Sequence, residues 1–195
     1  MSTTNRRQAV TPHAPAGAAP GALTLSSLVG ALAALGRRPA SEEVDAWMRR
    51  VEVTREELRP YLGFKEGTYA RHRVYLNDFA EVLVLCWRPG QRTPIHDHNG
   101  SFGSVRVLSG VLWETIFEME DGRGLAYRSA REWGAGDVTG ADVPDIHQLG
   151  NPDVSGQDLV TLHLYAPPLT SLNVYRVGSA DSVSTICMNS WNPTI

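Results

Sequence analysis

GQRTPIHDHNGSFGSVRVLSG, residues 90–110, places two histidines one residue apart between a turn-forming glycine and a β-branched run. In a β-strand, residues i and i+2 project to the same side, so His96 and His98 can converge on one point while Asp97 faces away. A metal ion about 2 Å from each imidazole nitrogen would occupy that point. The stretch therefore predicts a strand in a β-rich fold that carries two ligands of a metal site.

The chain on either side of this stretch changes character near residue 67. Upstream, apolar residues recur at helical spacing over 23–35, acidic residues open a second helix at Ser41, and Thr54 forms a capping box with Glu57. Downstream, β-branched and aromatic runs alternate with turn residues, which is the spacing of an antiparallel sandwich or barrel. We therefore expect an all-β fold, a β-barrel preceded by N-terminal α-helices.

Length and composition indicate one domain. The 195 residues suffice for one core, so we assign a domain over 23–195, with a helical segment (23–66) and a barrel (67–190). Residues 1–22, rich in Ala, Pro, Thr and Gly, are expected to be a disordered tail. A net charge of −3 provides no basic surface for nucleic acid. The apolar run 21–36 is too short to span a bilayer, so we expect a cytoplasmic protein without membrane contact. We also expect a monomer.

Two further side-chain types are expected to serve packing. Cys86 and Cys187 lie in apolar or β-like stretches and are expected to be buried reduced thiols. Trp87, Trp113 and Trp133 lie among valines and leucines on expected strands, so we expect them in the core rather than stacked on a substrate.

The spacing of glycines around the histidines has a family likeness. Gly90, five residues, His-x-His, four residues, Gly103, six residues and Gly110 together resemble the first signature of the cupin superfamily, with glycine replacing its usual glutamate. Downstream, Gly136 and HQLGN (147–151) resemble the second signature, although Asp142 and Pro144 depart from it. The resemblance implies a cupin jelly-roll barrel and a metal held by His96, His98 and His147.

A site with three imidazoles and no acid has a chemical consequence. Neutral ligands leave the double charge of a divalent ion uncompensated, so an anionic substrate can approach the opposite face. Glycine at position 103 therefore favours a substrate that brings its own negative charge. A thiolate is a good candidate, because a divalent metal deprotonates a coordinating thiol.

Several segments, in order over residues 23–190, resemble the cysteine dioxygenases, a family of non-haem iron enzymes within the cupins. These segments are TLSSLVGALAAL (24–35), YARH (69–72), LCWRPGQRTPIHDH (85–98) and LHLYAPPL (162–169). The resemblance implies an Fe(II) cofactor and oxidation of L-cysteine by O2 to cysteine sulfinic acid. The partners implied are therefore a small-molecule thiol and O2.

The resemblance also implies roles for residues around the metal. Arg71 matches the arginine that pairs with the substrate carboxylate, a contact suited to its planar fork of donors. Arg73, two residues on and on the same strand face, is the rival. Tyr69 either supports that carboxylate or packs beside it.

A second group lies on the strand that contains TLHLY. By strand alternation, Thr161, His163 and Tyr165 share a face, which permits a relay in which His163 orients the Tyr165 hydroxyl. In the animal members a cysteine at the position of Gly103 is crosslinked to the matching tyrosine. Glycine cannot form that bond, so Tyr165 is expected to remain an ordinary phenol.

Other functions stay open at the level of sequence. The same site in another thiol dioxygenase would act on 3-mercaptopropionate or cysteamine. Three histidines and a water also suit the tetrahedral zinc of a hydrolase or lyase. A cupin that only binds a small ligand, as a sensor or store, is a third class.

Overall fold

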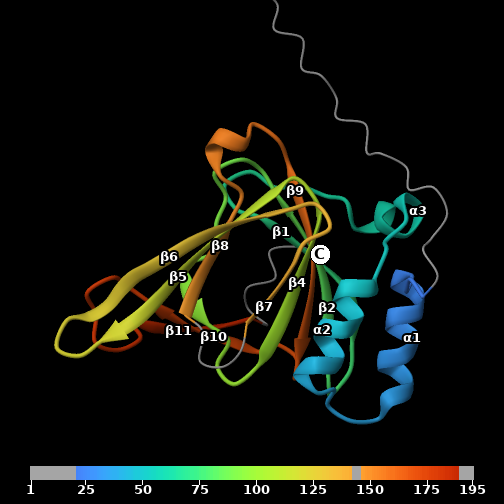
Figure 1. The fold of residues 1–195 in the computed structure, drawn as a ribbon, viewed down its shortest axis with the longest axis horizontal. Coiled ribbons are helices and arrows are strands. Elements are labelled where there is room, and N and C mark those ends of the chain that lie inside the picture. The colour runs from blue at the N-terminus through green and yellow to red at the C-terminus, as the bar shows by residue number, and fades with distance from the viewer. Residues whose placement is uncertain (1–20, 142–145, 189–195) are drawn as a thin grey trace, which may run out of the picture.

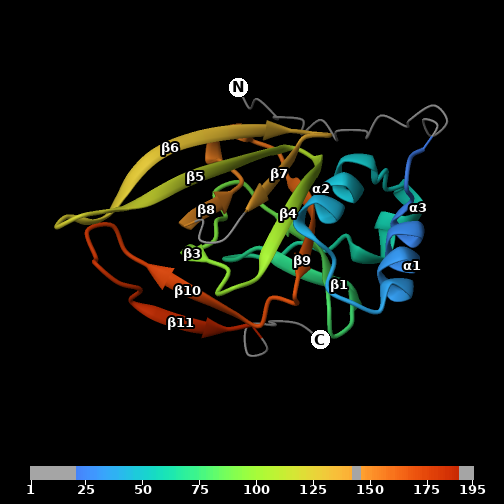
Figure 2. The same ribbon diagram turned by 60° about the horizontal axis from the view of Figure 1, so that its bottom comes forward.

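The computed structural model describes residues 21–141 and 146–188. Two sheets face each other as the walls of a barrel, and helices cover the outer side of one sheet (Figures 1 and 2). The expected all-β barrel with N-terminal helices is therefore confirmed. Of the expected tail, residues 1–20 lie outside the described residues, as do 189 and 190 at the end of the expected barrel.

The α-helices occupy the N-terminal part of the described chain: α1 (Leu25–Leu35), α2 (Ser41–Arg50) and α3 (Arg55–Leu58). There are also two 3-10 turns in the described residues. One, η1 (Arg59–Tyr61), follows α3 directly, and the other, η2 (Asp153–Ser155), lies late in the chain. The five-stranded sheet has the order β1 (Ala70–Leu76), β2 (Glu81–Trp87), β9 (Leu159–Ala166), β4 (Phe102–Ser109) and β7 (Val138–Ala141). The six-stranded sheet has the order β11 (Ser184–Cys187), β10 (Ser171–Tyr175), β3 (Ile95–Asp97), β8 (Ile146–Gly150), β5 (Val111–Glu120) and β6 (Gly124–Gly134).

Local signals explain where the helices begin and end. The Thr24 hydroxyl accepts a hydrogen bond from the backbone N–H of Ser27 at 3.0 Å, and Gly36 ends α1 with a φ of 64°. The expected capping box is present at α3, where Glu57 N–H donates to the Thr54 hydroxyl and Thr54 N–H donates to the Glu57 carboxylate, both at 3.1 Å. The predicted helix start at Thr54 is thus confirmed, whereas α1 begins at Leu25, two residues after the predicted start.

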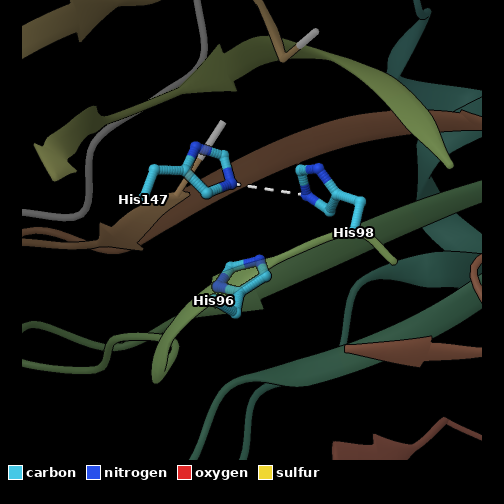
Figure 3. A group of neighbouring side chains, drawn as sticks. All are labelled: His96, His98 and His147. Carbon is cyan, nitrogen blue, oxygen red and sulfur yellow. Dashed lines mark hydrogen bonds between the residues drawn. The ribbon is translucent and has the colours of Figure 1, made fainter. Parts of the chain in front are cut away.

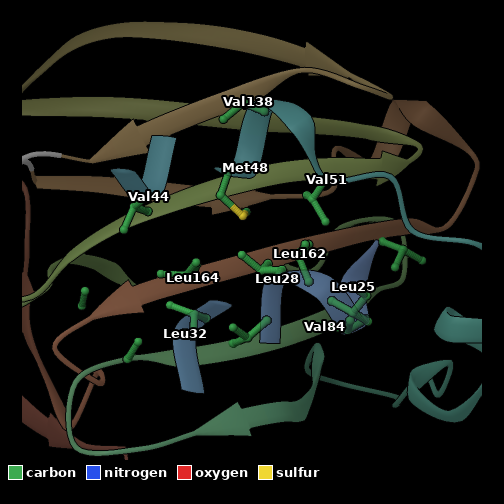
Figure 4. Close-up of a cluster of buried hydrophobic side chains, with 14 of the residues drawn as sticks. Leu25, Leu28, Leu32, Val44, Met48, Val51, Val84, Val138, Leu162 and Leu164 are labelled. Carbon is green, nitrogen blue, oxygen red and sulfur yellow. The ribbon is translucent and has the colours of Figure 1, made fainter. Parts of the chain in front are cut away.

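α1 and α2 pack on the outer face of the five-stranded sheet (Figure 4). The apolar side of α1 presents Leu25, Leu28 and Leu32, which recur at helical spacing. They meet alternate residues of the strands beneath, among them Val84 and Leu162. Burying these side chains gives the helices their stability, because short helices are marginal on their own.

The central strands β2 and β9 are buried along their whole length. Alternate side chains of a strand point to opposite faces, so one set meets the helices and the other faces the barrel interior. On β9, Leu162 and Leu164 belong to the helix-facing cluster, whereas Leu159 and Tyr165 belong to the interior cluster. Both faces of these central strands are therefore covered.

Two packing predictions were wrong. Cys187 is exposed because β11 is the outermost strand of its sheet, whereas Cys86 is buried as expected. Trp113 is 39% exposed, because its side chain lies on the outer face of the six-stranded sheet. The peptide bond Ala166–Pro167 is cis. None of the helices in the described ranges is long and apolar enough to cross a membrane.

Candidate metal centre

Three histidines meet inside the barrel (Figure 3). His96 on β3 and His147 on β8 lie directly opposite each other in the antiparallel ladder, and His98 follows β3 by one residue. One ring nitrogen from each lies within 4.8 Å of the other two, and all three side chains are buried. The structure thus brings together the three residues that were predicted from the sequence to be metal ligands.

Hydrogen bonds fix the orientation of two of the rings. His96 Nδ1 lies 2.9 Å from the carbonyl oxygen of Pro94, and His147 Nδ1 lies 2.9 Å from Oε1 of Glu114. Both oxygens can only accept, so each Nδ1 carries the proton and each Nε2 keeps its lone pair. The Nε2 atoms of His147 and His98 lie 3.3 Å apart. The lone pairs that a metal needs are therefore on the nitrogens that converge.

Burial keeps the imidazoles of His96 and His98 neutral. It lowers the pKa of His96 to about 3, with the charge of His147 as the next cause. Burial, followed by the neighbouring imidazoles, also holds the pKa of His98 well below its usual value. Neutral imidazole is the form that binds metals, and this donor set suits iron, zinc, copper or nickel. The residues present therefore fit a divalent transition metal.

Glu114 is part of the site, because it contacts His147, and it was not among the residues predicted from the sequence. Its side chain on β5 is buried and contacts His147, Thr139 and Trp133. Burial alone raises the pKa of Glu114, but the hydrogen bonds from these three donors outweigh it, so the pKa lies below its usual value. A signal was available in the sequence: Glu114 lies two residues after Leu112, so both side chains point to the same face of the expected strand, which places an acid on its interior face.

The structure separates the two arginines of β1. Arg71 and Arg73 pair with Leu85 and Leu83, which face the interior, so both arginines are on the inner face. Arg73 donates from Nε to the buried carboxylate of Glu81 at 2.9 Å. The charge of Arg71 instead acts on the pKa values of His96, His163, Tyr69 and Tyr165. Arg71 is thus the arginine whose charge acts on the histidine site.

A hydrogen-bonded chain runs along the inner face of β9. Trp87 Nε1–H donates to the Thr161 hydroxyl at 3.0 Å, Thr161 Oγ1 lies 2.8 Å from His163 Nε2, and His163 Nδ1 lies 3.1 Å from the Tyr165 hydroxyl. The Tyr165 ring in turn lies beside His98, with centroids 5.4 Å apart. The shared face expected from strand alternation is confirmed. Trp87, which was expected to serve packing alone, also belongs to this chain of hydrogen bonds.

Two aromatic rings complete the interior. Tyr69 stacks on Trp87 with centroids 4.1 Å apart, and burial raises its pKa. Burial, partly opposed by the charge of Arg71, also raises the pKa of Tyr165 to about 12, so the phenol is protonated at neutral pH. Gly103 lies opposite Tyr165 in the ladder, and a Cβ at Gly103 would lie 2.7 Å from two atoms of the ring. Glycine at this position is what lets the ring sit there.

A surface hollow of about 310 Å³ lies elsewhere, on the outer face of the six-stranded sheet. Thr115 and Gln148, which pair across β5 and β8, contribute to its wall, whereas their neighbours Glu114 and His147 point inward. The hollow is therefore separated from the histidines by the sheet itself.

A β-barrel whose interior gathers three buried imidazoles has the fold and the site of a metal-dependent cupin. The profile of a family described as cysteine dioxygenase type I matches residues 18–177, and the chain belongs to that family. It is similar to cysteine dioxygenase type 1 of Rattus norvegicus, 29% identical over 171 residues that cover 83% of this chain and 84% of the rat protein. It is also similar to cysteine dioxygenase type 1 of Homo sapiens, 30% identical over 169 residues with the same coverage of each chain, 83% and 84%. The protein is thus an enzyme of the cysteine dioxygenase type.

The chain is also similar to parts of solved structures of other proteins. A double-stranded beta-helix protein from Klebsiella pneumoniae is 20% identical, with a TM-score of 0.48 over 61% of this chain and 94% of that chain. A cupin from Methanocaldococcus jannaschii is 16% identical, with a TM-score of 0.42 over 54% of this chain and 87% of that chain.

Proposed function

We propose that the protein is an iron(II)-dependent thiol dioxygenase that oxidises L-cysteine with O2 to cysteine sulfinic acid. The observation that carries the proposal is a cluster of three buried imidazoles, with the charge of Arg71 acting on His96 and the buried phenol ring of Tyr165 beside His98. Membership of the cysteine dioxygenase family supports the same reaction.

In this proposal His96, His98 and His147 hold the metal. Three neutral donors leave its charge uncompensated, which favours an anionic substrate over a neutral one. When bound, the metal acidifies the thiol of the substrate and couples O2 to its sulfur. The protein contributes a closed barrel that excludes water and holds the reactants in place.

Arg71 binds the carboxylate of the substrate. Its planar fork of N–H donors suits bidentate contact with a carboxylate, and its charge lies near enough to lower the pKa of His96. Arg73 is unsuited to this role because its Nε–H already donates to Glu81. An arginine here disfavours cysteamine, which has no carboxylate, but it also suits 3-mercaptopropionate, which makes that thiol the second candidate substrate.

Tyr165 holds a proton at its phenolic oxygen beside the reactants. The Trp87 N–H occupies one lone pair of the Thr161 hydroxyl, so the Thr161 proton is available to His163 Nε2. His163 Nδ1–H then donates to the Tyr165 oxygen, which leaves the phenolic O–H directed away from His163. In this arrangement Tyr165 acts as a hydrogen-bond donor toward the substrate and His163 fixes its orientation.

The test is anaerobic loading of the full chain with Fe(II), followed by O2 uptake with L-cysteine, 3-mercaptopropionate and cysteamine, and mass analysis of each product. We expect the largest kcat/KM for cysteine and a product that has gained two oxygen atoms. Bound iron without thiol-dependent O2 uptake would contradict the proposal and favour a hydrolytic or purely ligand-binding cupin.

A matched pair of substitutions tests the arginine. Arg71→Lys keeps the charge but loses the planar fork, so kcat/KM for cysteine should fall by about 10- to 150-fold, the equivalent of about 1.5–3 kcal/mol for a charged hydrogen bond. Arg73→Lys makes the same chemical change on the same strand face while leaving Glu81 an ammonium partner, and should change kcat/KM by less than about twofold. Metal content should be equal in both variants. Equal kinetics for the two variants would remove Arg71 from the substrate site.

The expectations that the protein is a cytoplasmic monomer, and that it binds neither nucleic acid nor membranes, stay predictions. So does the boundary between the helical segment and the barrel.

A further inference from the structure

Glu114 is a buried carboxylate with donors on both of its oxygens. His147 donates from Nδ1 to Oε1 at 2.9 Å. Oε2 accepts from Trp133 Nε1 at 2.8 Å and from the Thr139 hydroxyl at 2.9 Å. These donors belong to β8, β6 and β7, so three strands hold the carboxylate in one position. Such a set of donors suits an ionised carboxylate, which can only accept.

The partner of His147 differs from that of His96. His96 directs its Nδ1–H to a neutral backbone carbonyl, that of Pro94, whereas His147 directs its own to the charged Glu114. An anion on the far side of an imidazole makes the opposite nitrogen a stronger donor and fixes which nitrogen keeps its lone pair. The two ligands are therefore unequal, and the difference lies in charge.

The position of this charge matters because Gly103 supplies none. The cupin signature that this chain resembles has a glutamate at that position. We propose that Glu114 is a positioning residue for the metal centre: it holds His147 with Nε2 toward the metal and provides, one imidazole further out, a negative charge that glycine at position 103 withholds. The carboxylate leaves the substrate-facing side open and still stabilises the bound cation. This inference rests on the metal-binding role proposed for His147.

The test compares Glu114→Gln with Glu118→Gln in the full-length protein. Gln has the shape of Glu but no charge, and its NH2 group must face the donor of either His147 or Trp133. Glu118 lies four residues further on the same strand, where it is exposed and pairs with Arg128, so it is a matched control. Dissociation constants for Co(II) and anaerobic Fe(II) are measured by competition with a chelator, together with the visible spectrum of the Co(II) form and the thermal midpoint of the metal-free protein.

We expect Glu114→Gln to weaken binding of both metals by about 10- to 100-fold and to shift the visible bands of Co(II), because His147 becomes a weaker donor. The affinity and spectrum of Glu118→Gln should match those of the unaltered protein. Unaltered protein that binds neither metal would overturn the metal site itself. Tight binding that Glu114→Gln leaves unchanged would overturn only the role of Glu114.

A second variant decides the matter if Glu114→Gln does not fold. Thr139→Val keeps the shape of the side chain and removes one donor from Oε2 without touching His147. Loss of this one hydrogen bond loosens the carboxylate, and the metal affinity should fall by about 2- to 10-fold. An affinity equal to that of the unaltered protein would overturn the proposal.

Discussion

Gly103→Ala tests the arrangement of Tyr165 most directly. A Cβ at residue 103 would lie 2.7 Å from both Cδ1 and Cε1 of the Tyr165 ring. Carbon atoms in contact normally lie about 3.5–4.0 Å apart, so the ring must retreat by about 1 Å. Because Tyr165 is buried, the retreat strains its surroundings, and the free energy of unfolding should fall by about 1–3 kcal/mol.

The same displacement should reduce turnover. The Tyr165 hydroxyl lies 3.1 Å from His163 Nδ1, and a shift of the ring by about 1 Å would carry it out of hydrogen-bond range. Misplacement of a catalytic group by about 1 Å can lower a rate by about 100-fold. We therefore expect kcat for cysteine to fall by about 10- to 100-fold. Metal content should not change, because Gly103 contributes no ligand.

The assays are urea unfolding, metal analysis and thiol-dependent O2 uptake. Gly30→Ala is the control, because Gly30 is exposed on α1 and its added Cβ would have no heavy atom within 4 Å. Alanine is the better helix former, so this control should raise the free energy of unfolding by about 1 kcal/mol and leave turnover unchanged. If Gly103→Ala unfolded and turned over like the unaltered protein, the inferred contact with the ring would be wrong.

Three further outcomes follow from burial and hydrogen bonding. Leu28→Ala leaves a cavity under α1, and the free energy of unfolding measured in urea should fall by about 2–5 kcal/mol; a loss below about 1 kcal/mol would mean that the helix does not seal the sheet. Trp87→Phe removes the donor to Thr161 and should lower the thermal midpoint, equivalent to about 1–3 kcal/mol, whereas an unchanged midpoint would count against the hydrogen bond. Burial lowers the pKa of His98 and of His163. Below about pH 6.5 these two histidines therefore bind protons in the unfolded chain but stay neutral in the folded one. The free energy of unfolding of the metal-free protein should therefore fall with decreasing pH, by up to about 1.4 kcal/mol per pH unit for each histidine, and a flat profile between about pH 7 and about pH 5 would contradict this.

Features with a local cause could be predicted from the sequence. The capping box of α3 involves residues three apart, and the shared face of Thr161, His163 and Tyr165 follows from strand alternation. The approach of His96 to His98 has the same origin. Their meeting with His147 is not local, and it was foreseen only because the spacing of the glycines resembles a known family.

Features that depend on strand pairing could not be predicted. The hydrogen-bond partners of Glu114 come from three other strands, and the sequence next to Glu114 does not indicate that Thr139 and Trp133 will contact it. The sequence favoured Arg71 over Arg73 only through the family resemblance, because the ion pair of Arg73 is made with Glu81, which lies on the next strand. Which face of a sheet is exposed to solvent likewise depends on which other elements pack against that sheet.

β9 has no free side. It pairs with β2 on one edge and β4 on the other, helices cover one of its faces, and the barrel contents cover the other. Its amide hydrogens should consequently be among the slowest in the molecule to exchange with deuterated water, since their exposure requires opening of the whole barrel. His163 and Tyr165, which lie on β9, would then lose their positions only when the whole barrel unfolds. Heat inactivation should therefore coincide with global melting instead of preceding it.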